Sequence, residues 1–210
     1  MRLKKCVRLA LPLALLLVAP CAHAQKKTAV HSDPSTPPAR TFRDVRSGVN
    51  LQIPAGWNLN RRDGEVSTFK LDARTASRLT QLRAVANIDF NPFPLSTFSG
   101  AYFYFSVTPR TTAAQCAAQA PTAAPRRAAT EAIAGVPFTH GYDEHGGVCI
   151  ESRDEIYTTQ RNGSCYRFDL VTENFCGGDV SGVREINQQQ LDALRKRLEA
   201  ILSTLQFTGK

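Results

Sequence analysis

Apolar and polar residues alternate along much of this chain with the two-residue period of β-strands. In the segment 49–53, Val49, Leu51 and Ile53 fall on one face and the polar residues between them fall on the other. The segment 101–107 is apolar on both faces, which is typical of a central strand that is covered on both sides. The strands expected in this half of the chain are 41–45, 49–53, 66–71, 84–90 and 101–107.

Two turn signals predict hairpins in the second half of the chain. The first is the dipeptide at 134–135, and the second is Asn162-Gly163, the pair most typical of a two-residue hairpin turn. The expected strands are 128–133 and 136–142 around the first turn and the two halves of 149–176 around the second.

Three segments have helical spacing. Thr112, with a glutamine three residues on, begins a short alanine-rich helix, and Asn187 begins an amphipathic helix that ends near Ser203. A weaker helical pattern covers 74–83. Mostly antiparallel strands with two or three helices indicate an α+β domain built in layers.

The N-terminal segment has the anatomy of a secretory signal peptide. Residues 1–24 begin with basic side chains, continue with an apolar run over 9–19 and end in small residues, so we expect cleavage after Ala24. The apolar run is too short to span a bilayer, which takes ~20 residues. A polar, proline-rich linker is expected over 25–40, followed by a single domain over 41–210.

Removal of the signal changes the charge of the protein. The whole chain has 26 basic and 18 acidic residues and a net charge of +8, but the signal contains four of the basic residues and none of the acidic ones. The mature chain therefore has a net charge of +4, which argues against nucleic acid as a partner. A lipoprotein signal with Cys21 at its end is an alternative, although Pro20 directly before it is unlike such signals.

Four cysteines remain in the mature chain, and an even number in an exported protein indicates two disulfides. Four cysteines allow three pairings. If Asn162 and Gly163 form the turn, residues that face one another across the hairpin have numbers that sum to 325, as those of Cys149 and Cys176 do. This register leaves Cys116 to pair with Cys165, and a single β-bulge would change it.

The segment from His140 to His145 is the densest group of possible metal ligands. His140, Asp143 and His145 could bind Zn²⁺ if a loop brought them together. The spacing is not that of a zinc motif, and the glycines at 141, 146 and 147 indicate instead a solvated hairpin loop. A metal-dependent hydrolase that uses this loop is the alternative function.

Aromatic residues suggest one further candidate surface. Residues 102–105 are aromatic on both faces of a strand, which favours a core strand over a stacking platform. Phe93 lies between Pro92 and Pro94 in a proline-rich loop with Phe98 nearby, and these two residues are the candidates for an exposed contact with a partner. The chain has no nucleophile elbow and no glycine-rich nucleotide motif, so we expect no catalytic residue and no cofactor.

Both ends of the expected domain resemble the PsbP-like family. The segment 42–57 begins Phe42-Arg43-Asp44 and ends PAGW, which is similar to that family's opening hairpin and its P-x-G-W exit. The segment 201–207, ILSTLQF, is similar to the closing I-L-x-S-L-x-F pattern, with the serine one place early. The resemblance implies a central antiparallel sheet between helices and a binding or assembly role without catalysis. No functional residue of the family has a counterpart here.

These observations predict a periplasmic or secreted, non-catalytic binding or assembly module. Its partner is expected to be a protein or a component of the cell envelope. The chain is expected to be monomeric and to have no stable membrane span.

Overall fold

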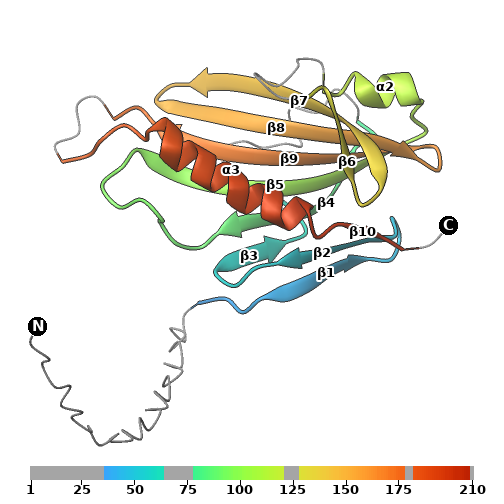
Figure 1. Cartoon of the computed structure of the whole chain (residues 1–210), viewed down its shortest axis with the longest axis horizontal. Coiled ribbons are helices and arrows are strands. Elements are labelled where there is room, and N and C mark those ends of the chain that lie inside the picture. The colour runs from blue at the N-terminus through green and yellow to red at the C-terminus, as the bar shows by residue number, and fades with distance from the viewer. Residues whose placement is uncertain (1–35, 64–77, 121–127, 178–181, 209–210) are drawn as a thin grey trace, which may run out of the picture. The chain divides into compact units, whose positions relative to one another are not determined.

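Two antiparallel sheets and a long C-terminal helix form the fold (Figure 1). The computed structural model describes residues 36–63, 78–120, 128–177 and 182–208, all within the unit Asp33–Lys210. The expected signal over 1–24, the linker up to residue 35 and the expected strand over 66–71 lie outside the described residues.

The larger sheet has seven strands among the described residues, and each strand is antiparallel to its neighbours. In spatial order they are β3 (Trp57–Asn60), β4 (Gln81–Ile88), β5 (Phe98–Pro109), β9 (Ser164–Phe175), β8 (Ile150–Arg161), β7 (Val136–Gly147) and β6 (Thr130–Ile133). β5 is the central strand expected from its sequence: Phe103 and Phe105 pack in the core on one face, and Tyr102 and Tyr104 are buried on the other.

The smaller sheet joins the two ends of the domain. β1 (Arg40–Asp44) and β2 (Val49–Ile53) form the expected hairpin, and β10 (Gln206–Phe207) pairs with β2. β1 begins one residue earlier than expected, so Arg40 belongs to the domain and not to the linker.

An ion pair connects the smaller sheet to the larger one. Arg83 of β4 donates two hydrogen bonds to the carboxylate of Asp44 of β1, with distances of 2.6 and 2.7 Å. Burial by itself would raise the pKa of Asp44, but hydrogen bonds from Arg83 and Ser47 and the charge of Arg83 outweigh it and lower the pKa to about 2.

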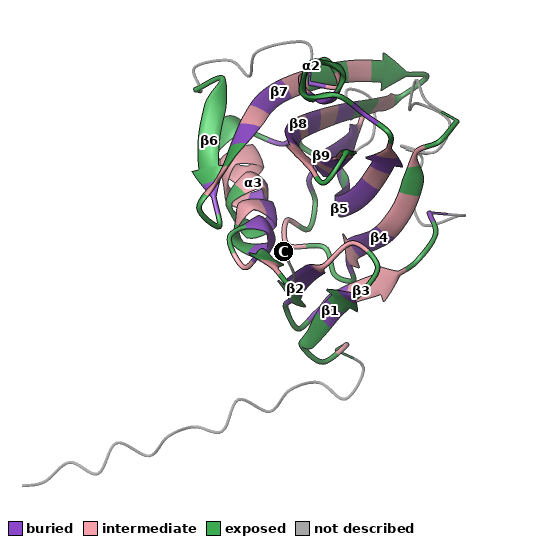
Figure 2. Cartoon of the chain, turned by 90° about the vertical axis from the view of Figure 1, so that its right-hand side faces the viewer, coloured by how far each residue is buried: buried purple, intermediate pink, exposed green. Residues whose placement is uncertain are grey.

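The helix α3 (Gln188–Leu202) covers one face of the larger sheet, as Figure 2 shows. It begins with the expected capping box, in which Asn187 accepts from the backbone N–H of Gln190, and its C-cap is Ser203. The apolar side of α3 faces the sheet. Leu194 and Leu198 on this side are buried and belong to the same hydrophobic core as Phe168.

The short helix α2 (Ala113–Ala117) lies on the opposite face. It also has the expected capping box, at Thr112, and Cys116 in it forms a disulfide with Cys165 of β9. Because side chains alternate along β9, Cys165 and Arg167 face α2, whereas Phe168 faces the core under α3.

The second expected disulfide is also confirmed. β8 and β9 pair without a bulge, from Arg161 opposite Ser164 to Ile150 opposite Phe175, and Cys149 and Cys176 are joined just beyond. The two disulfides indicate an oxidising, extracytoplasmic compartment. Within the described residues, no helix is long and apolar enough to cross a membrane.

Two expectations about secondary structure are wrong. Gln81, Leu82 and Arg83 lie in β4 and not at the end of a helix, because pairing with β5 and the bond to Asp44 outweigh a weak helical pattern. The segment 140–147 is not a solvated loop but a continuous part of β7, paired with β8 along its whole length.

Candidate functional site

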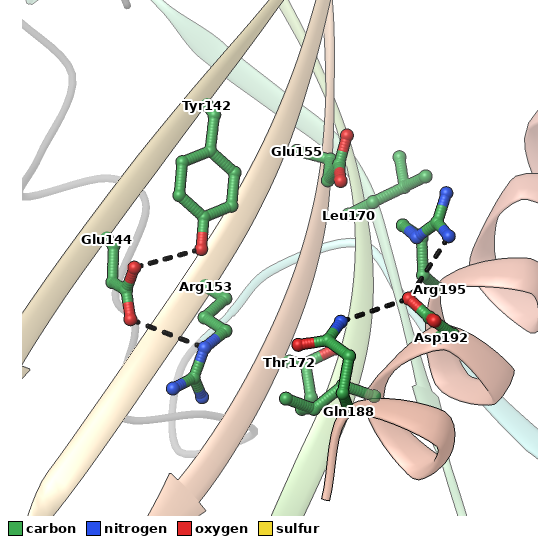
Figure 3. A pocket seen from close by; sticks show the side chains of 10 residues that line it. Tyr142, Glu144, Arg153, Glu155, Leu170, Thr172, Gln188, Asp192 and Arg195 are labelled. Atoms are coloured by element: carbon green, nitrogen blue, oxygen red, sulfur yellow. Dashed lines mark hydrogen bonds and ion pairs between the residues drawn. The ribbon is translucent and has the colours of Figure 1, made fainter. Parts of the chain in front are cut away.

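A pocket of about 740 Å³ opens between α3 and the three strands β7, β8 and β9 (Figure 3). It is mostly polar, with an apolar part formed by two leucines. Its lining consists of Tyr142, Glu144, Arg153, Glu155, Leu170, Thr172, Gln188, Leu191, Asp192 and Arg195.

The pocket forms where the core face of the sheet changes from apolar to polar. Every second residue of β7 faces α3, and along the strand these are Phe138, His140, Tyr142 and Glu144. Exposure rises along this series: the first two are buried, Tyr142 is half-buried and Glu144 is exposed. The core therefore ends in a polar pocket on this side of the sheet.

One wall of the pocket is an ion pair between β7 and β8. Arg153 lies 3.3 Å from Glu144, measured from Nε to Oε1, and the Tyr142 hydroxyl donates to the other oxygen of Glu144 at 3.1 Å. Burial and the negative charge of Glu144 raise the pKa of Tyr142 to about 12. The hydroxyl is thus neutral at ordinary pH and acts as a donor.

The other wall is the first half of α3. Arg195 pairs with Asp192 and with Glu199, each at 3.2 Å, and Gln188 donates to Asp192 at 3.1 Å. These i,i+3 and i,i+4 bonds fix the direction in which the side chains point toward the pocket.

His140 lies behind the pocket and supports Glu155. Its Nε2 is 2.5 Å from Oε2 of Glu155, and its ring stacks on that of Tyr157 with centroids 4.2 Å apart. His140 is 2% exposed, so it contributes to the site through Glu155 and not directly.

β7 does not bring the three expected metal ligands together. His140 faces α3, whereas Asp143 and His145 lie on the opposite face, with 3.3 Å between Oδ2 and Nδ1. No group of three or more possible ligands gathers anywhere among the described residues. A hydrolase based on these residues stays a prediction, and it would need β7 to rearrange.

Phe93 and Phe98 are not the exposed contact that the proline-rich loop suggested. Phe98 is buried, and Phe93 is half-buried against it with ring centroids 6.5 Å apart. Removing apolar ring surface from water is favourable, which explains why these rings pack against the protein and do not project into solvent. The exposed apolar residue of this loop is Leu95, which is 73% exposed.

A buried charged cluster that the sequence analysis missed lies on the face opposite the pocket. Arg167 donates to Asp169 from Nε at 2.7 Å, and its Nη2 lies 3.6 Å from Asp154. Burial and the nearby charge of Asp169 raise the pKa of Asp154 well above its usual range. The arrangement places one guanidinium group between two buried carboxyl groups.

The sequence matches no family model and none of the curated proteins. Solved structures that are similar in fold include the following three. A Bacteroides thetaiotaomicron protein has 10% identity and a TM-score of 0.46 over 82% of this chain, which spans half of that protein. Cyanobacterial PsbP of Synechocystis has 13% identity and a TM-score of 0.44 over 80% of this chain and 92% of its own. LpqN of Mycobacterium tuberculosis, described as involved in cell envelope biogenesis, has 10% identity and a TM-score of 0.41 over 85% of this chain and 88% of its own.

These similarities concern the course of the chain and assign no ligand or partner. They include a PsbP protein, as the resemblance of the two ends of the sequence led us to expect, and the fold is α+β with mostly antiparallel sheets, as predicted.

Proposed function

We propose that this protein is an exported, non-catalytic binding module and that the pocket under α3 holds its ligand. The observation that carries the proposal is the pairing of the charged side chains in this pocket. Arg153 is paired with Glu144, Arg195 with Asp192, and Glu155 with His140. These partners hold the charged side chains in place and give the pocket a defined shape and charge for binding.

The charges of the lining favour a cationic ligand. Three carboxylates line the pocket, those of Glu144, Glu155 and Asp192, against two guanidinium groups. His140 engages one oxygen of Glu155, and among the described residues no hydrogen bond reaches the other oxygen. An ammonium group on an apolar stem fits this lining, because the stem can lie on Leu170 and Leu191 while the charge meets Glu155.

A single lysine residue, blocked as its acetyl and methylamide derivative, is the smallest probe of this site. NMR titration is expected to give a dissociation constant on the order of 1 mM, as befits so small a ligand. Blocked norleucine, which lacks the charge, and blocked glutamate, which reverses it, are the matched ligands and should bind at least about tenfold more weakly.

Two variants of α3 test the location of the site. Leu191→Trp fills the pocket and should weaken binding of the blocked lysine by about tenfold or more. Lys196→Trp places the same side chain on an exposed position of the same helix and should leave binding unchanged. Equal binding by Leu191→Trp and the wild type, or no preference for lysine over glutamate, would contradict the proposal.

A further inference from the structure

Among the described residues, no strand pairs with the outer side of the second half of β7, which we call the open edge. β6 pairs with β7 only over Val136–Thr139, and one further backbone bond runs from the His140 N–H to the Ala129 carbonyl at 2.9 Å. Beyond it, the residues from Gly141 to Gly147 pair with β8 on one side. On the other side, no strand pairs with them within the described part of the chain.

The alternation of the backbone shows which groups face outward on this edge. The N–H of His140 points away from β8, because it bonds to Ala129. Backbone directions alternate along a strand, so Tyr142, Glu144 and Gly146 also direct their N–H and C=O groups away from β8. The open edge therefore has three outward N–H and three outward C=O groups that no strand of the described residues pairs with.

Few of the features that protect sheet edges are present here. Natural edges are commonly short, bulged, or guarded by proline or lysine. β7 has twelve residues and pairs with β8 without a bulge, and its single proline, Pro137, lies in the half that β6 covers. The open half has carboxylates in place of lysine, at Asp143 and Glu144.

We propose that this edge accepts an extended, basic polypeptide segment of a partner as an additional β-strand. The inference rests on the proposed function, because Tyr142 and Glu144 belong both to the edge and to the pocket. Every second side chain of an added strand would fall on the face of the sheet that α3 covers. Backbone bonds along β7 would hold the segment, and a lysine or arginine side chain would enter the pocket.

Charge complementarity identifies the partner segment as basic. The 15 residues from 141 to 155 include five carboxylates and one arginine, in a chain whose net charge is +8. One of the five, Asp154, is buried on the other face, and the remaining four lie near the pocket or the edge. A second copy of this chain fits less well, because two acidic edges side by side would repel each other.

Amide hydrogen exchange tests the added strand residue by residue. The probe is a short blocked peptide of alternating lysine and valine, with a peptide of alternating glutamate and valine as its charge-reversed control. The lysine peptide is expected to slow exchange at Tyr142, Glu144 and Gly146. It should change exchange little at Asp143 and His145, which already bond to β8.

Two proline variants give a matched test of the edge. Gly146→Pro removes one outward N–H without breaking a bond to β8, and it should weaken binding of the lysine peptide by about tenfold. Ala132→Pro places proline on the outer edge of β6 and should leave binding unchanged. Thermal unfolding of both variants checks that they fold.

Each remaining outcome overturns a defined part of the proposal. The added strand is wrong if the lysine peptide binds without slowing exchange at the three amides, or if it binds Gly146→Pro as tightly as the wild type. In either case, binding of the blocked lysine residue would still support the pocket. Equal binding of the glutamate peptide overturns the basic partner. Slow exchange at the three amides in the protein alone, together with a dimer in solution, assigns the edge to a second copy. Failure of both the peptide and the blocked lysine overturns the pocket itself.

Discussion

The bond between Asp44 and Arg83 makes a quantitative prediction, because it is the ion pair that joins the two sheets. Asp44 is 4% exposed and receives both hydrogen bonds from Arg83, so water screens the pair little. Asp44→Asn keeps the shape of the side chain and removes its charge. We expect the variant to unfold more easily than the wild type at neutral pH.

The size of the effect follows from the pKa of Asp44. It is lowered from 3.8 to about 2, which corresponds to about 2 kcal/mol of stability at pH 7. Because the pKa is lowered in the folded state, this contribution is present above the unfolded pKa and is lost as the pH falls through the folded one. The difference between wild type and variant should thus fall to about 1 kcal/mol at pH 3 and well below that at pH 2.

Urea unfolding at several pH values measures this difference directly. Asp89→Asn removes an exposed carboxylate near the same sheet and is the control, with an expected change within about 0.5 kcal/mol. A double-mutant cycle with Arg83→Gln should assign most of the loss to the pair itself. A loss below about 0.5 kcal/mol at pH 7, or one that does not shrink in acid, would refute the reasoning.

Three further predictions concern the rest of the fold. Asp154→Asn should stabilise the protein at neutral pH: burial and Asp169 raise the pKa of Asp154 in the folded state, so its ionisation costs stability as the pH rises above the unfolded value. The gain in urea midpoint should be larger at pH 8 than at pH 5, and a loss at both would contradict it. Replacing Cys116 and Cys165 with serine should lower the free energy of unfolding by about 4 kcal/mol, because this disulfide closes a loop of 49 residues. Replacing Cys149 and Cys176 should lower it by about 3.5 kcal/mol, because that loop has 27 residues. The reverse order of the two losses in unfolding experiments would contradict this prediction. Leu198→Ala, at a position 1% exposed under α3, should cost about 2–5 kcal/mol in the same assay, whereas a loss under about 1 kcal/mol would mean that α3 packs loosely.

The hairpin turn and the helix starts could be predicted from short sequence signals, because each depends on a few residues with a strong local preference. Asn162 and Gly163 both have positive φ and form the turn of β8 and β9, so the register and the Cys149–Cys176 disulfide followed from counting along the chain. The two capping boxes, at Thr112 and Asn187, likewise placed both helices.

The pocket could be predicted only in part. The same register places Arg153 opposite Thr172 and Glu155 opposite Leu170, so the wall formed by β8 and β9 was implicit in the sequence. The strand over 136–142 was expected, but its continuation to Gly147 and its pairing with β8 were not. The turn between β7 and β8 consists of Val148 and Cys149, and Cys149 has a φ of +61°, which is unusual for that residue type.

The α3 wall was missed for a different reason. Asp192 and Arg195 lie on the polar side of an amphipathic helix, and that pattern is the same for a solvated face and for a pocket wall. Only the packing of α3 over the end of the sheet distinguishes the two.

The most direct test of the pocket is a set of nuclear Overhauser contacts between the blocked lysine residue and the methyl groups of the protein. Binding under α3 predicts contacts from the lysine stem to Leu170 and Leu191, which line the pocket. Contacts to exposed apolar residues elsewhere, such as Leu95 or Val148, would show that the ligand binds outside this pocket and would contradict the account.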